Sequence, residues 1–376
     1  MLPGPTVDRI SLADVLTSCL AAVRSEENRL GLGSANRIVV VLVDGLGTAA
    51  LRARAGHART LSAATGQTID TVFPTTTAAA LASFATGAMP GEHGLVGYSV
   101  LDAAHDRVVN QLSGWDDELD PATWQRLPTV FERARAQGFS AVAVGPERFQ
   151  SSGFTQAVLR GAEYRVAASI SDRFAVAARW LGEPGPPGLL YLYIPELDMV
   201  AHALGWESSE WTALLEEVDS EVRRLSGLLR ATDGMLLSAD HGIVDIPVTA
   251  HLLIDSAPEL VESVRFVAGE PRCLQLHFEP DLNTDDRDAL VARWRDAESG
   301  RAWIATRDEA IAAGWFGAVA PEVLPRIGDL LVAARKNVAY YDGRAATKHS
   351  LAMIGQHGSW SPAELQVPLL RFGAFA

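Results

Sequence analysis

The feature that most constrains the fold is the run from Arg37 to Val43, in which every residue after the arginine is aliphatic. A continuous β-branched run without polar alternation is typical of a strand that is covered on both faces, as in a parallel sheet. Similar runs occupy residues 140–145, 189–194 and 234–239. Because helical patterns alternate with these runs, the sequence predicts an α/β fold: a doubly wound, mainly parallel central sheet with helices on both faces.

The connecting stretches carry hydrophobic residues at helical spacing. The expected helices cover residues 8–24, 128–137, 171–181 and 209–229. A last core strand is expected at Val367 to Phe372, where the chain becomes strongly apolar again. Residues 1–254 and 343–376 are therefore expected to form one large core.

The hydrophobic pattern of the sequence changes between residues 255 and 342. Strand-like alternation and one helical pattern occur there, at residues 264–267, 272–278, 303–306 and 285–296. We expect residues 255–342 to form a small α+β insertion beside the main sheet, over the mouth of the site. The apolar run at 328–334 is expected to return to the core as a further strand of the main sheet.

Composition excludes several classes of protein. With 32 basic and 46 acidic residues among 376, the net charge of −14 argues against general binding to nucleic acid or to an anionic membrane. The two cysteines, Cys19 and Cys273, are too few for a cysteine-rich zinc site and give little support for a disulfide. No basic leader or long apolar span is present, which predicts a cytoplasmic protein. The composition leaves the oligomeric state open.

Three threonines, Thr75 to Thr77, stand where a helix is expected to begin, and Ala78 to Thr86 continue it without a breaker until Gly87. Threonines before an apolar helix are more often simple caps than nucleophiles. A hydroxyl on the first turn nevertheless faces unpaired N–H groups and the positive end of the helix dipole, where a phosphate binds well. The functional interpretation requires that other segments bring metal ligands to this helix end.

Acidic and imidazole side chains follow the predicted core strands. Asp44 comes directly after the strand that ends at Val43, and Asp240-His241-Gly242 follows the strand at 234–239. In open α/β sheets, ligands bind beyond the carboxyl ends of the strands. Taken alone, Asp44 serves equally well as a helix cap, and the Asp-His-Gly tripeptide is more often a polar loop than a metal site.

A second pair of ligands follows the strand at 189–194. Asp198 and His202 are four residues apart, so one helical turn places both on one face, where they offer oxygen and nitrogen to a single ion. Such a pair is common by chance, but its place just beyond a buried strand favours a site. With His357 near the end of the chain, the seven candidate ligands suffice for two divalent ions: Asp44, Thr77, Asp198, His202, Asp240, His241 and His357.

The order of these motifs resembles the alkaline phosphatase superfamily and, within it, the nucleotide pyrophosphatase/phosphodiesterase branch, also called the type I phosphodiesterases. The resemblance covers most of the chain outside residues 255–342. Its specific pieces are Phe73-Pro74-Thr75-x-Thr77, Thr86-Gly87-x-x-Pro90-x-x-His93-Gly94, Asp198-x-x-x-His202, Asp240-His241-Gly242 and His357-Gly358. The histidines outside these motifs, His277 among them, are expected on the surface or in loops.

The resemblance implies a role for each matching residue. Thr77 falls on the family's nucleophile, and His93 on a structural position. One metal ion would be held by Asp198, His202 and His357. The other would be held by Asp44, Asp240 and His241, with the Thr77 oxygen as a further ligand. Oxygen and nitrogen ligands without sulfur favour zinc, then manganese or iron.

Two positions depart from the pattern of the branch. Ala78-Ala79-Ala80 stand where its members typically have Phe-Pro-Asn, which removes part of the expected lining for a nucleobase. Tyr98 stands where they have an asparagine that binds a phosphoryl oxygen, so Tyr98 is the candidate substrate-binding residue here. Both departures weaken the assignment to nucleotides but leave phosphoryl transfer in place.

The sequence therefore predicts a metal-dependent hydrolase that cleaves phosphodiester or pyrophosphate bonds in small phosphate esters through a phospho-threonine at Thr77. A phosphomonoesterase or a phosphonate hydrolase on the same site is the alternative, although no motif places an arginine near Thr77 for a dianion. A sulfatase is disfavoured because that branch uses Cys or Ser as its nucleophile. A mutase would need a large domain between the core strands, and a non-catalytic binding protein would be expected to lack a ligand.

Overall fold

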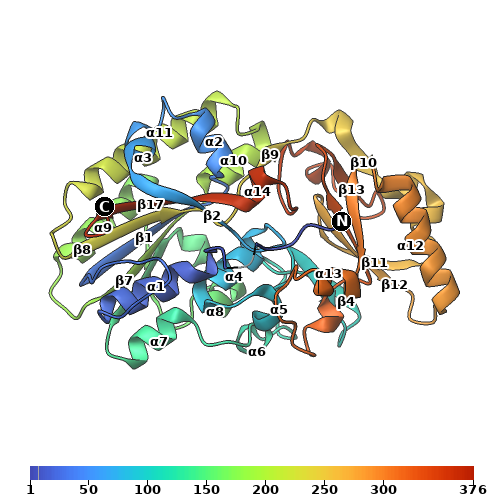
Figure 1. The fold of residues 1–376 in the computed structure, drawn as a ribbon, viewed down its shortest axis with the longest axis horizontal. Helices are drawn as coiled ribbons and strands as arrows, with labels where there is room; N and C mark the ends of the chain where they lie inside the picture. The colour runs from blue at the N-terminus through green and yellow to red at the C-terminus, as the bar shows by residue number, and fades with distance from the viewer. Residues whose placement is uncertain (7) are drawn as a thin grey trace.

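The computed structural model describes residues 1–6 and 8–376 and contains one large sheet at the centre of its larger part (Figure 1). This sheet has seven strands in the order β2-β17-β8-β1-β7-β5-β6. Their bounds are β1 (Arg37–Val43), β2 (Thr65–Asp70), β5 (Ser140–Gly145), β6 (Glu163–Val166), β7 (Gly188–Ile194), β8 (Asp233–Ser238) and β17 (Gln366–Gly373). Only the contacts of β17 with β8 and β2 are antiparallel, which confirms the mainly parallel sheet.

Helices cover both faces of the sheet, as a doubly wound fold requires (Figure 1). One face carries α1 (Ala13–Val23), α4 (Thr77–Thr86), α7 (Val130–Ala136) and α8 (Gly153–Val158). The other carries α2 (Thr48–Ala53), α3 (Arg59–Ala63), α9 (Ile170–Gly182), α10 (Glu196–Leu204) and α11 (Ser209–Ser226). Short helices α5 (Pro90–His93), α6 (Pro121–Trp124) and α14 (Pro362–Leu365) lie in the connections. The predicted connecting helices are thus present.

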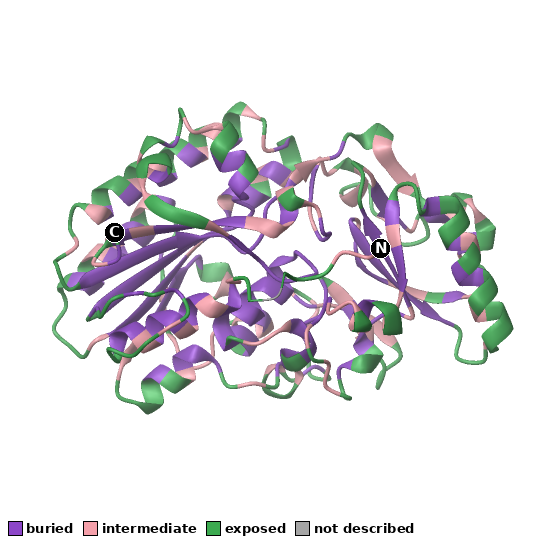
Figure 2. Cartoon of the chain, in the orientation of Figure 1, coloured by how far each residue is buried: buried purple, intermediate pink, exposed green. Residues whose placement is uncertain are grey.

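The core strands are buried along their whole length, as their composition predicted. Every residue of β1 is buried, because β7 and β8 flank it and helices cover both of its faces. Figure 2 shows the buried residues concentrated in this sheet and on the helix faces turned toward it. The edge strands differ: β6 is half exposed, and the first three residues of β2 are exposed.

A second sheet forms the smaller part of the molecule (Figure 1). Its four antiparallel strands run in the order β11 (Val264–Glu270), β12 (Cys273–Phe278), β14 (Leu330–Ala334) and β13 (Ala302–Thr306). Helix α12 (Thr284–Glu298) packs on β13, and α13 (Arg307–Ala312) follows that strand. The expected return of residues 328–334 to the main sheet is wrong, because β14 pairs with β12 and β13 and its buried run fills the middle of the second sheet.

Three two-stranded ladders complete the described structure. They are β3 (Ser99–Asp102) with β4 (Arg107–Asn110), β9 (Val244–Asp245) with β16 (Gly355–Gln356), and β10 (His251–Leu253) with β15 (Ala339–Tyr341). Short 3-10 turns occupy Glu147–Phe149, Val248–Ala250, Ile254–Ser256, Pro258–Leu260, Leu324–Arg326 and Ser350–Ala352. The β9–β16 ladder matters for the site, because it draws the segment before His357 against the segment after His241.

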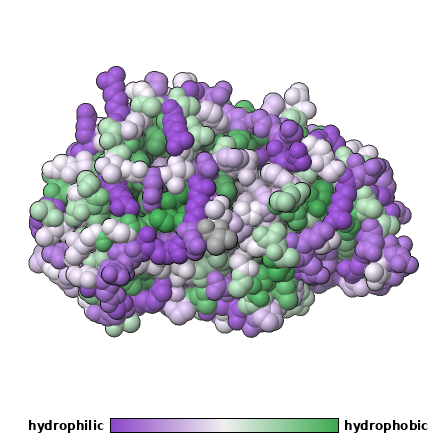
Figure 3. All heavy atoms as spheres, in the orientation of Figure 1, coloured by the Kyte–Doolittle hydropathy of each residue, from purple (hydrophilic) through white to green (hydrophobic). Residues whose placement is uncertain are grey.

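On the face seen in Figure 3, hydrophilic side chains spread over the whole molecule, with hydrophobic ones in small groups between them. Among the residues that the structure describes, no helix has both the length and the apolar character needed to cross a bilayer. Both cysteine thiols are free and buried.

Candidate active site

Parallel pairing brings the chain segments of the candidate site to one edge of the main sheet. In the register of β1, Val43 pairs with Ile194 of β7, and Leu42 pairs with Ser238 of β8. Asp44, the start of α10, and Asp240 therefore leave the sheet side by side. The residues that the sequence predicted from three separate strand ends meet here because parallel neighbours end together.

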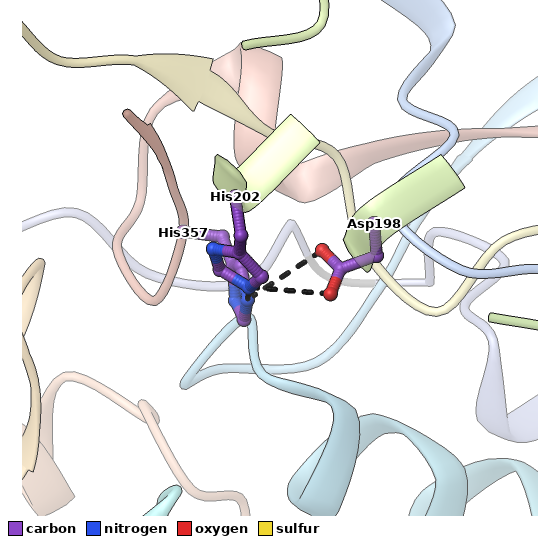
Figure 4. A group of neighbouring side chains, drawn as sticks. All are labelled: Asp198, His202 and His357. Atoms are coloured by element: carbon purple, nitrogen blue, oxygen red, sulfur yellow. Dashed lines mark hydrogen bonds and ion pairs between the residues drawn. The ribbon is translucent and has the colours of Figure 1, made fainter. Parts of the chain in front are cut away.

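The first group of ligands comes from α10 and from the loop after β16. His202 Nε2 lies 3.2 Å from Asp198 Oδ2, and His357 Nε2 lies 3.9 Å from Asp198 Oδ1. Donor atoms of all three residues lie within 4.8 Å of one another. Figure 4 shows the two rings and the carboxylate turned toward a common point. The structure thus brings together Asp198, His202 and His357.

The ring nitrogens of this group fit a bound cation. His202 Nδ1 lies 2.7 Å from the Gly355 carbonyl, and His357 Nδ1 lies 2.8 Å from the Thr75 carbonyl. Since a carbonyl only accepts, both Nδ1 atoms are assigned the proton, so in the neutral rings both Nε2 atoms carry lone pairs. These two Nε2 atoms face each other at 3.3 Å. Two facing lone pairs repel, whereas a metal ion between them satisfies both, as in histidine sites oriented by a backbone carbonyl.

The second group surrounds Thr77. His241 Nε2 lies 3.1 Å from Thr77 Oγ1, 3.4 Å from Asp44 Oδ1 and 3.5 Å from Asp240 Oδ2. His241 Nδ1 lies 3.2 Å from the Gly242 carbonyl, which assigns its proton in the same way. Donor atoms of Asp44, His241 and Asp198 also lie within 4.8 Å of one another, so Asp198 adjoins both groups. All seven predicted ligands therefore surround one small region.

Three carboxylates share this buried space. Burial raises the pKa of Asp44 well above its ordinary value, and the negative charges of Asp240 and Asp198 add to the effect. Burial also raises the pKa of Asp240. Burial acts in the same direction on Asp198, but the neighbouring imidazoles, His202 first, outweigh it and lower the pKa of that carboxyl.

The carboxylate oxygens add a second test of the fit to cations. Asp44 Oδ1, Asp198 Oδ1 and Asp240 Oδ2 are buried and accept no hydrogen bond from any described residue. Buried acceptors are normally satisfied, because an unpaired one carries a desolvation penalty. Divalent cations would satisfy these oxygens and neutralise the charge that the carboxylates concentrate here.

Several supporting residues escaped the sequence analysis. The Tyr193 hydroxyl donates to Asp44 Oδ2, and Tyr193 lies on β7 just before the strand ends. Thr75 Oγ1 donates to the Ser359 carbonyl at 2.9 Å and accepts from Gly358 N–H at 3.0 Å, which fixes the loop that carries His357. The alternation of side chains along β7 could have indicated Tyr193, because this residue shares a face of the strand with Tyr191 near the strand end.

A buried ion pair ties the second sheet to the same loop. Arg272, in the turn between β11 and β12, donates to Glu364 of α14 through Nε at 3.1 Å and Nη2 at 2.7 Å. Both side chains are almost wholly excluded from solvent. Glu364 also accepts from Ser359 N–H at 3.0 Å and from the Ser361 hydroxyl. The residues just after His357 are therefore anchored from both parts of the molecule.

Tyr98 lies at the boundary between the two parts, with 39% of its surface exposed. Its N–H donates to Glu270 Oε2 at 3.1 Å, and Glu270 comes from the end of β11. Burial raises the pKa of Glu270 to about 8. No described contact joins the Tyr98 side chain to the ligand groups.

The remaining histidines lie away from the ligands. His93 is buried in contact with Ser83 and accepts from Leu95 N–H at 3.1 Å, and burial lowers its pKa to about 3. His277, which the sequence analysis expected on the surface or in a loop, is buried within β12. That expectation is wrong, since β12 is flanked by β11 and β14 and its apolar neighbours bury the whole strand.

A pocket of about 190 Å³ opens directly beside Thr77. Thr77 and Leu81 of α4 form one wall, Phe154 and Val158 of α8 form another, and Tyr191 of β7 contributes to the lining. Among the described residues that line it, none is Lys or Arg, and the only charged ones are two of the candidate metal ligands, Asp44 and Asp198.

Comparisons with known proteins agree with these motifs. Residues 38–360 match the family model described as type I phosphodiesterase / nucleotide pyrophosphatase. A curated relative is an uncharacterized pyrophosphatase/phosphodiesterase of Schizosaccharomyces pombe, 25% identical over 181 residues. That alignment covers 46% of this chain and 36% of the yeast protein, so the match spans about a third of the relative's length.

Comparison with solved structures identifies the fold of this chain. Murine ectonucleotide pyrophosphatase/phosphodiesterase 5 superposes with a TM-score of 0.68 at 16% identity, over 89% of this chain and 88% of the murine chain. The human protein gives the same score and identity, over 89% and 87%. An inactive threonine-to-alanine variant of the murine protein, in complex with AMP, gives a TM-score of 0.68 at 15% identity, over 90% and 88%. The alkaline-phosphatase-like α/β fold is confirmed.

Proposed function

Because this chain belongs to the type I phosphodiesterase/nucleotide pyrophosphatase family of metal-dependent hydrolases, we propose that it cleaves phosphodiester or pyrophosphate bonds with Thr77 as the nucleophile. The observation that carries the proposal is the convergence of the other six ligands around Thr77, whose Oγ1 lies 3.1 Å from His241 Nε2. The inactive threonine-to-alanine murine variant that was solved with AMP supports the same role for a threonine in a related fold.

We assign two divalent ions, with zinc as the first choice, to these residues. Asp198, His202 and His357 would hold one ion, and they meet within 4.8 Å. Asp44, Asp240 and His241 would hold the other, with Thr77 as a further ligand. When bound, the ions lower the pKa of the threonine hydroxyl and place positive charge beside the phosphoryl oxygens.

The chain itself supplies the nucleophile and hydrogen-bond donors to the phosphoryl group. Thr76 at the N-cap of α4 makes no side-chain cap, so the first N–H groups of this helix are available to phosphoryl oxygens. The Thr77 oxygen forms a bond to phosphorus as the bond to the leaving oxygen breaks. The hydroxyl proton passes to solvent, and the leaving oxygen takes up a proton from solvent. Water then cleaves the bond between Thr77 and phosphorus.

The substrate class follows from the charges around Thr77. A phosphomonoester dianion calls for additional cationic side chains, whereas a diester monoanion needs room for a second substituent. The pocket beside Thr77 offers space, and its described lining has no Lys or Arg. We therefore favour a diester over a monoester or a phosphonate, with a small phosphate ester rather than a nucleic-acid polymer as the substrate.

Activity on bis-p-nitrophenyl phosphate tests the nucleophile. Thr77→Ala should abolish turnover and leave the folded state intact, whereas Thr77→Ser should keep part of it, because serine retains the hydroxyl. Circular dichroism and thermal unfolding check the fold of both variants. Turnover by Thr77→Ala at the wild-type rate would remove Thr77 from the mechanism.

We infer that residues 255–342 form an insertion in the core made by 1–254 and 343–376, since the four strands of the second sheet all lie within that range. We also propose that the protein acts in the cytoplasm, with its two cysteines kept as free thiols.

A further inference from the structure

The pocket beside Thr77 has a composition that the phosphoryl chemistry alone does not explain. Beyond the ligands, its lining is mainly aromatic and aliphatic, with two hydroxyl residues, Ser152 and Thr155, and it is contributed mainly by α8, β7 and the turn before α8. Leu81 lines it from α4, one helical turn after Thr77, so the nucleophile and the pocket share one helix face. A substituent on the phosphorus atom attacked by Thr77 therefore lies at the mouth of this pocket.

Three of the hydroxyls that line the pocket are engaged by the protein itself, whereas those of Thr155 and Tyr191 make no hydrogen bond with a described residue. The Tyr164 hydroxyl donates to the Pro146 carbonyl at 2.9 Å, and the Tyr193 hydroxyl donates to Asp44. The Ser152 hydroxyl donates to the Phe149 carbonyl at 3.1 Å and accepts from Thr155 N–H at 3.1 Å. A nucleobase would bury several donors and acceptors here with few partners, and each unpaired group weakens binding.

The size of the pocket sets the size of its occupant. A cavity of about 150 Å³ lined by apolar side chains holds one benzene molecule. The 190 Å³ beside Thr77 therefore fits one phenyl-sized group with a short linker, whereas a base together with its ribose would extend beyond the pocket. Phe149, Phe154 and Tyr164 in the lining provide the ring faces and edges that an aromatic group packs against.

The direction of attack decides which substituent enters. In phosphoryl transfer, the attacking and leaving oxygens lie roughly in line on opposite sides of phosphorus. Thr77 is itself a wall of the pocket, so a group in the pocket lies beside the attacking oxygen rather than opposite to it. The occupant is accordingly the substituent that stays on phosphorus, and the leaving group departs on the other side.

Resting on the proposed phosphodiesterase activity, we propose that the pocket beside Thr77 selects phosphodiesters whose retained substituent is a compact, uncharged aromatic or branched apolar group, in preference to nucleosides. This selectivity comes from the lining of α8 and β7, and it agrees with the alanines at 78–80, which are themselves buried.

Esters that share one leaving group test this selectivity. Phenyl, methyl and thymidine-5′ p-nitrophenyl phosphates differ only in the group that remains on phosphorus. Because full burial of an aromatic ring is worth about a tenfold to hundredfold preference, kcat/KM should be higher for phenyl than for methyl by that factor. The thymidine ester should fall below the phenyl ester. Equal values for phenyl and methyl, or the highest value for thymidine, would overturn the proposal.

A pocket variant and a matched control locate the effect. Thr155 is half-buried in the lining, and Thr155→Phe should fill the pocket, which removes the preference for phenyl over methyl while the methyl ester is still cleaved. Gln156, the next residue on α8, is exposed and outside this lining, so Gln156→Phe should keep the wild-type preference. A full preference for phenyl in folded Thr155→Phe protein would contradict the assignment.

Binding separates this inference from the proposed reaction. Calorimetry with metal-loaded protein should give tighter binding of phenylphosphonate than of methylphosphonate, by about tenfold to hundredfold, and Thr155→Phe should remove the difference. Equal affinities in wild type would refute the pocket assignment even if all three esters were cleaved. If phenylphosphonate bound more tightly but no ester were cleaved, the pocket assignment would stand and the phosphodiesterase proposal would fail.

Discussion

The ion pair between Arg272 and Glu364 gives the prediction with the best-defined magnitude. Arg272 holds both carboxylate oxygens of Glu364, and the two side chains are 1% and 0% exposed. Replacing Arg272 by leucine would leave the Glu364 carboxylate buried with only the Ser359 N–H and the Ser361 hydroxyl as partners among the described residues. Loss of one partner of such a pair typically costs about 3–5 kcal/mol.

Equilibrium urea unfolding of the metal-free protein measures this cost. Arg272→Leu should lower the free energy of unfolding by about 3–5 kcal/mol. The double variant Arg272→Leu/Glu364→Leu should be less destabilised, because no unpaired charge stays buried. The exposed pair Arg295–Glu309 supplies the control, and Arg295→Leu should cost about 1 kcal/mol or less.

The pair should also affect the site, because Glu364 anchors the residues that follow His357. Arg272→Leu protein that remains folded should bind zinc more weakly than wild type, as loss of supporting contacts commonly lowers metal affinity by about 10- to 100-fold. Two results would refute the reasoning: a cost no greater than that of Arg295→Leu, or a double variant that is less stable than Arg272→Leu alone.

Three further predictions follow from the described contacts. Tyr193→Phe removes the donor to Asp44 and should weaken zinc binding about 10- to 100-fold in chelator competition, whereas Tyr164→Phe should leave it unchanged. Since the pKa of Glu270 is raised to about 8, the metal-free folded state keeps a proton that the unfolded state loses near pH 4.5, so the free energy of unfolding should fall as pH rises from 4.5 to about 8. Urea unfolding at both ends of that window measures this loss, which is on the order of 5 kcal/mol and which Glu270→Gln should abolish. An equally steep fall in the variant would exclude Glu270 as its source. Chelation should silence turnover and added zinc or manganese should restore it, while activity that survives prolonged chelation would contradict the two-ion assignment.

The central strands could be predicted because each is buried on both faces and therefore carries an uninterrupted apolar run. Strands β1, β5, β7 and β8 are formed by such runs. The edge strands β2 and β6 were missed, since one side of each is unpaired and polar residues such as Thr65 and Glu163 suffice there. Strand β14 was assigned to the wrong sheet because an apolar run indicates that a strand is buried but not which strands it pairs with.

The candidate ligands could be predicted because each stands in a short motif at a strand end or a helix start. Their support could not, since it depends on contacts between distant segments. Glu364 and Arg272 are 92 positions apart, and neither residue has a local pattern that indicates an ion pair. Glu270 likewise reaches Tyr98 only because β11 packs against β3, the strand that begins directly after Tyr98.

The stereochemical course at phosphorus tests the central claim most directly. A chiral phosphorothioate diester would be hydrolysed in isotopically labelled water, and the configuration of the product would be determined by phosphorus NMR. Attack by Thr77 followed by attack of water makes two in-line displacements, each with inversion, so the account predicts net retention. Net inversion would mean that water attacks the substrate directly, and it would contradict a phospho-threonine at Thr77.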